Sequence, residues 1–193
     1  DYTYVCGDAT PAYDPRKVKL FLRQFVYLRP DLFVIYDRTE SAGPLPRQWM
    51  LHSLKPAELK DNEALISDWN GKLWVRMLLP EAVKSRQYQM VAKRDEPGYG
   101  QKSSRKDNYI AFTPVRPAAR QDFLTVLYAM GKDTPPITSC ERIRRDGRPG
   151  ARVVIGDTTY EVTFATTGPP AGHVSIKGPE RSVEKDLSAG IRR

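Results

Sequence analysis

Apolar and polar side chains alternate with a period of two along much of the chain. Val18, Leu20 and Leu22 occupy every second position, and residues 32–36 form a second run rich in β-branched and aromatic side chains. Residues 29–31 (Arg-Pro-Asp) lie between them and favour a turn, because proline presets φ and aspartate can cap its own backbone. The pattern predicts an antiparallel hairpin.

Two further hairpins are predicted from their turn residues. Strand-like runs flank Asn70-Gly71, a pair that tolerates positive φ at both central positions of a tight turn. Two more runs flank Gly-Asp-Thr-Thr at residues 156–159. We expect strands over residues 18–28, 32–36, 47–54, 64–69, 73–78, 87–92, 109–115, 122–129, 151–155, 160–165 and 171–176.

Short strands with regular turn signals account for most of the sequence, which predicts an all-β fold. We expect an antiparallel β-sandwich of roughly ten or more strands, with a barrel as the related alternative and little helix. Only residues 56–60 and 80–85 are compatible with a helical turn. Residues 93–107 are polar and contain glycine and proline, which predicts a long surface loop.

The expected domain organisation is one β-sandwich domain over residues 1–178. Residues 179–193 lack a core pattern, so we expect a flexible tail there. The chain starts at Asp1 rather than at a methionine, so we expect it to be an excerpt or a processed piece of a longer protein.

Composition narrows the class of protein but not its function. The 193 residues include 31 Lys+Arg and 23 Asp+Glu, a formal net charge of +8, and 40% hydrophobic residues. This is an ordinary folded composition, which excludes wholesale disorder and allows one sizeable core or two small ones. No apolar run approaches the roughly 18–20 residues of a membrane helix, so we expect no membrane span.

Several chemical classes are excluded because their motifs are missing from the sequence. It contains no glycine-rich phosphate loop, GxSxG elbow, HExxH or paired CxxC motif. Cys6 and Cys140 allow one disulfide at most, and we expect two buried free thiols. Ten tyrosines include candidates for a general base, although packing is the expected role of each.

His52 is the candidate metal ligand. Strand alternation places His52 on the same face as Met50 and Leu54, with Trp49 and Leu51 on the other face. Both faces carry apolar residues, so we expect each side of this strand to be at least partly covered. Two interpretations of His52 remain: a hydrogen-bonded core histidine, or a metal-binding or catalytic imidazole. A zinc site would need two or three further ligands.

Two basic clusters are candidate substrate-binding sites. Guanidinium groups suit carboxylate, sulfate and phosphate oxygens, whereas a solvated basic face is the alternative. A nucleic-acid partner is not expected, because no recognisable binding motif accompanies the charge. The candidate residues are Arg142, Arg144 and Arg145, near Arg148 and Arg152, and Lys102 and Arg105 in the expected loop.

The order of the segments resembles the C-terminal part of the heparinase II/III-like polysaccharide lyases. The specific part of the resemblance covers about the first third of the chain. The matching segments are residues 4–10 (YVCGDAT), 23–31 (RQFVYLRPD), 33–38 (FVIYDR), 48–52 (QWMLH) and, less specifically, 123–127 (FLTVL).

The resemblance implies an architecture and an activity. Such lyases combine an N-terminal α/α toroid with β-sandwich layers and cleave uronic-acid polysaccharides by β-elimination. Nothing in this chain matches the toroid, which supplies most of the acid and base, so no catalytic residue is carried over. The resemblance therefore implies a sandwich that forms one wall of the substrate cleft, binds an acidic polysaccharide and is inactive alone.

The resemblance also implies a metal and a location. The histidine that ends the Trp-x-Leu-His strand resembles a ligand of a structural zinc, which makes His52 the candidate here, with the other ligands upstream of Tyr2. We expect Asp37 to tie a turn or pair with Arg38. A secreted or periplasmic location is implied, and a non-catalytic carbohydrate-binding or interaction sandwich is the alternative function.

Overall fold

The computed structural model describes the backbone of residues 1–94 and 103–188 and, outside residues 91–106, their side chains. Within this part of the chain the fold is all-β, as predicted, with one 3₁₀ turn, η1 (Thr10–Ala12), as its helical element. None of its helical segments is long and apolar enough to cross a membrane. The strands are β1 (Tyr2–Asp8), β2 (Val18–Leu28), β3 (Leu32–Ser41), β4 (Trp49–Ser53), β5 (Ala57–Lys60), β6 (Glu63–Asp68), β7 (Gly71–Leu79), β8 (Val83–Arg94), β9 (Ser103–Pro114), β10 (Arg120–Met130), β11 (Ile137–Arg145), β12 (Arg148–Ile155), β13 (Thr158–Phe164), β14 (Ala171–Gly178) and β15 (Arg181–Ser188).

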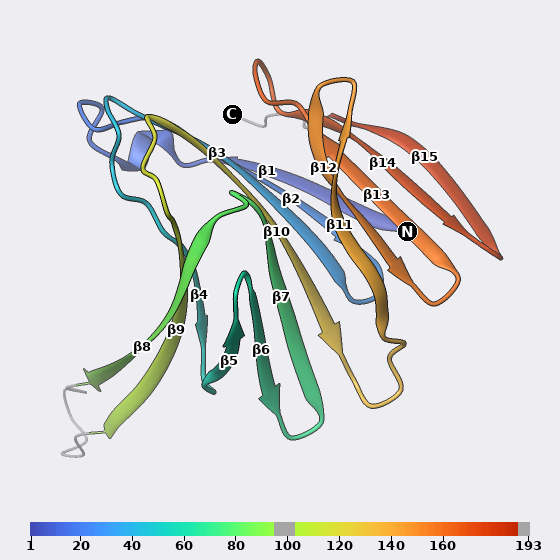
Figure 1. The fold of residues 1–193 in the computed structure, drawn as a ribbon, viewed down its shortest axis with the longest axis horizontal. Coiled ribbons are helices and arrows are strands. Elements are labelled where there is room, and N and C mark those ends of the chain that lie inside the picture. The colour runs from blue at the N-terminus through green and yellow to red at the C-terminus, as the bar shows by residue number, and fades with distance from the viewer. Residues whose placement is uncertain (95–102, 189–193) are drawn as a thin grey trace.

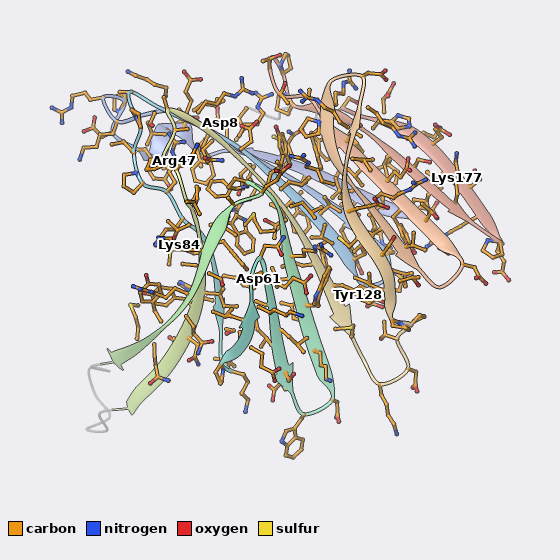
Figure 2. The ribbon with its side chains drawn as sticks, in the orientation of Figure 1. Asp8, Arg47, Asp61, Lys84, Tyr128 and Lys177 are labelled. Atoms are coloured by element: carbon orange, nitrogen blue, oxygen red, sulfur yellow. The ribbon has the colours of Figure 1, made fainter. Side chains whose placement is uncertain are left out.

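The strands form three antiparallel sheets arranged as layers (Figure 1). The central sheet has seven strands in the order β1-β2-β3-β10-β7-β6-β5. A five-stranded sheet, β11 to β15 in sequence order, packs on one face, and a three-stranded sheet, β4-β9-β8, packs on the other. Side chains occupy the space on both faces of the central sheet (Figure 2).

Strand alternation assigns the side chains of the central sheet to two separate cores. On β3, Val34 and Tyr36 belong to the core shared with the five-stranded sheet, whereas Ile35 belongs to the core shared with the three-stranded sheet. Because β3 is covered on both faces, its sequence reads as a continuous apolar run rather than an alternating one.

The predicted hairpins are present, but one turn is shifted by a residue. Asp68 pairs with Gly71, so Trp69 and Asn70 form the turn between β6 and β7. Neither Asn70 nor Gly71 is among the described residues with positive φ, so the expected Asn-Gly turn conformation is wrong. The tight turn with positive φ at both central positions lies instead at Asp146-Gly147 (φ 50° and 76°), between β11 and β12.

Three other local expectations are wrong. Residues 57–60 are strand β5 rather than a helical turn, and β8 begins at Val83 within the other candidate helical segment. Part of the expected loop continues the β8–β9 ladder, because Lys93 pairs with Ser104, and backbone pairing needs no apolar side chain on a solvated face. Residues 95–102 lie outside the described part of the chain.

The expected tail is partly structured. Residues 181–188 form β15 and pair with β14 along its whole length, so the expectation of a flexible segment is wrong there. An edge strand needs few inward apolar residues, and β15 supplies Val183 and the buried Leu187. Residues 189–193 lie outside the described part of the chain.

Candidate functional site

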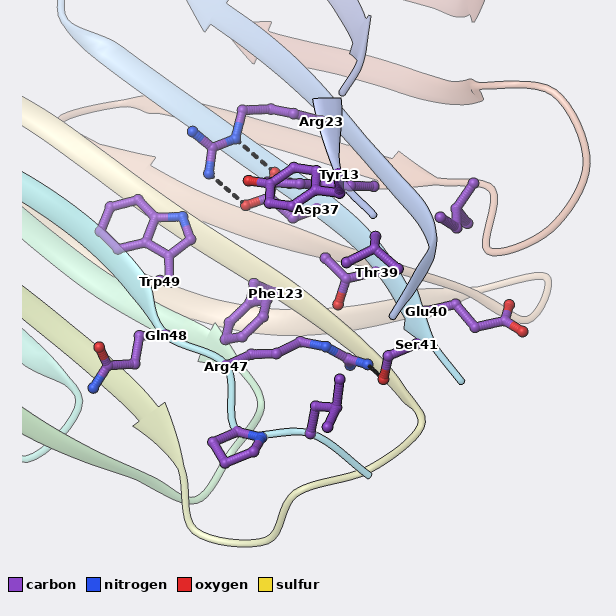
Figure 3. A pocket seen from close by; sticks show the side chains of 15 residues that line it. Tyr13, Arg23, Asp37, Thr39, Glu40, Ser41, Arg47, Gln48, Trp49 and Phe123 are labelled. Carbon is purple, nitrogen blue, oxygen red and sulfur yellow. Dashed lines mark hydrogen bonds and ion pairs between the residues drawn. The ribbon is translucent and has the colours of Figure 1, made fainter. Parts of the chain in front are cut away.

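A cleft of about 270 Å³ opens at one end of the central sheet, on the side of the three-stranded sheet (Figure 3). Its walls come from β2, β3 and β10 and from the segment that connects β3 to β4. The lining residues are Tyr13, Val18, Leu20, Phe21, Arg23, Asp37, Thr39, Glu40, Ser41, Leu45, Pro46, Arg47, Gln48, Trp49 and Phe123.

The cleft exists because segment 42–48 separates from the central sheet after β3. Odd-numbered residues such as Phe21 and Phe123 point from the central sheet toward this side, which gives the cleft an aromatic floor. The segment 42–48 contains Pro44 and Pro46, whose missing N–H groups cannot join a ladder. It therefore crosses over the sheet and forms the opposite wall before β4 begins at Trp49.

An ion pair between a buried carboxylate and a partly exposed guanidinium forms one wall of the cleft. Arg23 donates two hydrogen bonds to Asp37, Nε to Oδ1 and Nη2 to Oδ2, each at 2.7 Å. Asp37 is only 2% exposed, and burial raises the pKa of its carboxyl while the Arg23 guanidinium opposes this rise. The expected pairing of Asp37 with Arg38 is wrong. Arg38 points to the other face, where its Nη2 donates to the carbonyl of Gly168 at 2.8 Å.

Two hydrogen-bond donors near the opposite wall lack partners. Arg47 Nη2 donates to Ser41 Oγ and, at 2.7 Å, to the carbonyl of Ala119, which holds the guanidinium across the end of the cleft. Arg47 Nη1 and the indole Nε1 of Trp49 are buried without a hydrogen-bond partner in the described part of the chain. Burial also lowers the pKa of Arg47.

The chemistry of the cleft suits a ligand with an apolar face and a polar edge. Arg23 and Arg47 carry two positive charges, and Asp37 and Glu40 carry two negative charges, so the lining has no net charge. An apolar floor with a few polar groups that fix orientation is typical of small-molecule sites. A volume of about 270 Å³ equals that of about nine water molecules, which is room for one sugar ring.

The expected arginine cluster is divided between the two faces of the five-stranded sheet. Arg142 and Arg144 share a face with buried Cys140, so they point toward the central sheet. Arg145 points outward, where it pairs with Glu161 at 2.5 Å, and Arg152 pairs with the same carboxylate at 3.0 Å.

The other basic cluster is only partly described. Lys102 lies outside the described residues. Arg105 is in β9 opposite Ala92, and its side chain is not among those described.

His52 lies on β4 with an exposed side chain, so the interpretation of His52 as a core residue is wrong. Its ring lies 5.5 Å from that of Tyr109, on the same sheet face as Met50 and Leu54, which are 42% and 59% exposed. The predicted shared face is confirmed, but this face is open because no described element covers it. No group of three or more His, Cys, Asp or Glu suited to a metal occurs among the described residues, so they do not complete a zinc site.

Neither the cysteines nor Tyr4 and Tyr36 are activated. Cys6 and Cys140 are free thiols as expected, but only Cys140 is buried, and Cys6 is half-buried. Burial raises the pKa of Cys140 to about 12. Burial also raises the pKa of Tyr4 to about 12 and raises the pKa of Tyr36. These tyrosines stay protonated near neutral pH, which favours packing over a role as general base.

The Arg23–Asp37 pair could have been predicted from the register of the expected hairpin, although not from the residue types alone. A hairpin that pairs Leu28 with Leu32 must also pair Arg23 with Asp37, five positions away on each strand. The opposite charges of directly facing residues then predict an ion pair. Arg47 and Trp49 had no comparable signal, because the path of segment 42–48 depends on tertiary packing.

Solved structures with a similar fold include a heparan sulfate lyase and a heparinase III gene product. Heparan sulfate lyase HepC from Pedobacter heparinus matches with a TM-score of 0.61 at 13% identity, covering 87% of this chain and 26% of that chain. A mutant of HepC from the same organism matches with a TM-score of 0.56 at 12% identity, covering 86% of this chain and 26% of that chain. The heparinase III BT4657 gene product matches with a TM-score of 0.52 at 13% identity, covering 96% of this chain and 26% of that chain.

No protein-family model matches the sequence, and no curated protein matches it either. The chain spans about a quarter of the length of the solved structures that it matches. At this level of identity the match shows a shared fold. The similarity to heparinase II/III-like lyases inferred from residues 4–52 is therefore confirmed at the level of the fold.

Proposed function

We propose that this chain is the C-terminal β-sandwich region of a polysaccharide lyase that cleaves uronic-acid polysaccharides by β-elimination. The observation that carries the proposal is the fold shared with heparan sulfate lyase HepC and with a heparinase III gene product over 86–96% of the chain. The proposed role of this region is to form one wall of the substrate cleft. The acid and base would come from another part of a longer protein.

The cleft beside the Arg23–Asp37 pair supports a contact with sugar. The apolar face of a sugar ring can pack on Phe21 and Phe123, and its hydroxyl groups can reach the polar rim. The basic residues Arg142, Arg144, Arg145, Lys102 and Arg105 are proposed to contribute attraction to the acidic chain.

The same cleft also favours a second candidate function, a carbohydrate-binding module without catalysis. The carboxylate of Asp37 is fully engaged by Arg23, so it is not free to act as an acid or base. Both candidates predict sugar binding by this chain. They differ in whether the complete protein forms an unsaturated uronate.

We expect this chain to bind heparan sulfate oligosaccharides without cleaving them. Calorimetric titration should detect binding, while ultraviolet absorbance of the unsaturated uronate product should not increase. Tyr13 is 46% exposed at the cleft, so Tyr13→Ala should weaken binding with little effect on folding. Loss of one aromatic contact predicts a roughly two- to tenfold weaker affinity.

Trp69→Ala is the matched control, because Trp69 is 96% exposed on the β6–β7 turn and does not line the cleft. Equal weakening by both substitutions would contradict binding at the cleft. Product formation by this chain alone would contradict its proposed dependence on another part of the protein.

For His52 we propose a role as one zinc ligand in a longer protein, with the remaining ligands from outside this chain. The exposed position of its imidazole on the open face of β4 supports this proposal. His52→Ala in the longer protein should lower the zinc content, because loss of one ligand weakens an N/O/S site strongly. Metal analysis by mass spectrometry measures this, His173→Ala serves as the control, and unchanged zinc in His52→Ala would remove His52 from the ligands.

A further inference from the structure

A second cavity, of about 300 Å³, lies on the opposite face of the central sheet, between it and the five-stranded sheet. Four segments that are distant in sequence meet there: the end of β7, β10, the β11–β12 hairpin and the segment that follows β13. Its lining includes Leu79, Asp122, Arg142, Arg144, Pro149 and Thr166.

Arg142 and Arg144 supply positive charge to this cavity. Both side chains are on the inward face of β11, at the end of the hairpin where the two sheets separate. Arg144 Nε donates to the carbonyl of Gly147 at 3.2 Å, which orients the guanidinium and leaves both Nη groups without another partner in the described part of the chain. Arg142 pairs with Glu81 at the rim.

Asp122 lines the same cavity with a carboxylate whose hydrogen bonds are incomplete. Its Oδ2 accepts a hydrogen bond from the hydroxyl of Tyr36 at 2.8 Å and lies 3.6 Å from Arg120 Nη2. Its Oδ1 is buried without a hydrogen-bond partner among the described residues. A carboxylate with an unmatched oxygen is unfavourable, so a ligand hydroxyl that donates to the Asp122 carboxylate would be stabilising.

We propose that this cavity binds one hydroxylated carboxylic acid, such as a uronic-acid residue. The carboxylate of the ligand is held by Arg144 and Arg142, and a ligand hydroxyl donates to the Asp122 carboxylate. Leu79 and Pro149 contact the apolar face of the sugar ring. This proposal adds a second sugar contact, away from the cleft, to the proposed function. The choice of a uronic acid as the ligand rests on that proposed function.

The test is a titration with sodium glucuronate, followed by calorimetry and by amide chemical shifts. We expect saturable binding with shifts at residues 142–144 and 122. Arg144→Gln should weaken binding by at least roughly tenfold, the effect of losing a charge-assisted hydrogen bond to a carboxylate. Arg148→Gln is the matched control, because Arg148 is on the same hairpin but lies opposite Arg145 on the outward face and does not line the cavity.

Three further ligands, glucose, acetate and heparan sulfate oligosaccharides, test separate parts of this proposal. Glucose lacks the carboxylate and should bind at least tenfold more weakly than glucuronate, and acetate lacks the hydroxyls and should do the same. Acetate binding as tight as glucuronate binding would overturn the role of Asp122, and equal losses in Arg144→Gln and Arg148→Gln would overturn the site. Heparan sulfate oligosaccharides should still respond to Tyr13→Ala in the Arg144→Gln background, which separates failure of this site from failure of the proposed function.

Discussion

Replacing Phe164 by alanine is expected to destabilise the protein by about 3–5 kcal/mol, the range for deleting a large buried aromatic side chain. Phe164 is 0% exposed and stacks on Tyr36, with ring centroids 5.0 Å apart and planes 17° apart. The two rings join the five-stranded sheet to the central sheet, so the loss includes packing as well as transfer from water. Urea denaturation followed by tryptophan fluorescence measures the change.

The control for this prediction is Val5→Ala. Val5 is 56% exposed on the edge strand β1, so its truncation should change the free energy of unfolding by less than about 0.5 kcal/mol. A similar loss of stability in both variants would contradict the inference that packing between the two sheets causes the larger loss in Phe164→Ala.

Replacing Arg23 by leucine is expected to cost about 1–3 kcal/mol at neutral pH, because it leaves the buried carboxylate of Asp37 without its partner. The cost is below that of a fully buried pair, because the Arg23 side chain is 44% exposed and water screens that side of the pair. The loss should be smaller at acidic pH. Burial already raises the pKa of Asp37 above its usual value, and removal of the guanidinium raises it further. The folded variant then binds a proton that the unfolded chain does not, so its stability falls as pH rises from the unfolded pKa through the raised folded pKa.

Urea denaturation of Arg23→Leu and the parent protein at pH 5 and pH 8 measures this dependence. Arg16→Leu is the matched control, because Arg16 makes a similar forked contact with Asp14 but its side chain is 88% exposed. Exposed ion pairs contribute little, so Arg16→Leu should lower the stability much less than Arg23→Leu. A larger loss for Arg23→Leu at pH 5 than at pH 8 would contradict the buried-carboxylate explanation.

The features that the sequence predicted are those determined over short distances. The β2–β3 hairpin follows from its turn residues, and the shared face of Met50, His52 and Leu54 follows from strand alternation. The covering of each face does not follow, because it depends on which distant strands pair. The exposure of His52 is an example, since β4 pairs with β9 across more than fifty residues.

The candidate sites show the same division. Arg142, Arg144 and Arg145 looked like one basic cluster in the sequence, but strand alternation sends the first two inward and the third outward. Alternation alone predicts that Arg144 and Arg145 differ. It does not say which faces the cavity, because that is fixed by buried Cys140 against the central sheet. The shifted turn at Asn70-Gly71 likewise reflects the register of β6 against β7, which overrode the local preference.

The double covering of the central sheet has a practical consequence on β10. Asp122 lines the cavity beside the five-stranded sheet, and Phe123, the next residue, lines the cleft on the other side. One peptide bond thus separates the two proposed sugar contacts. The backbone amide signals of Asp122 and Phe123 can therefore report ligand binding separately on the two faces of the central sheet.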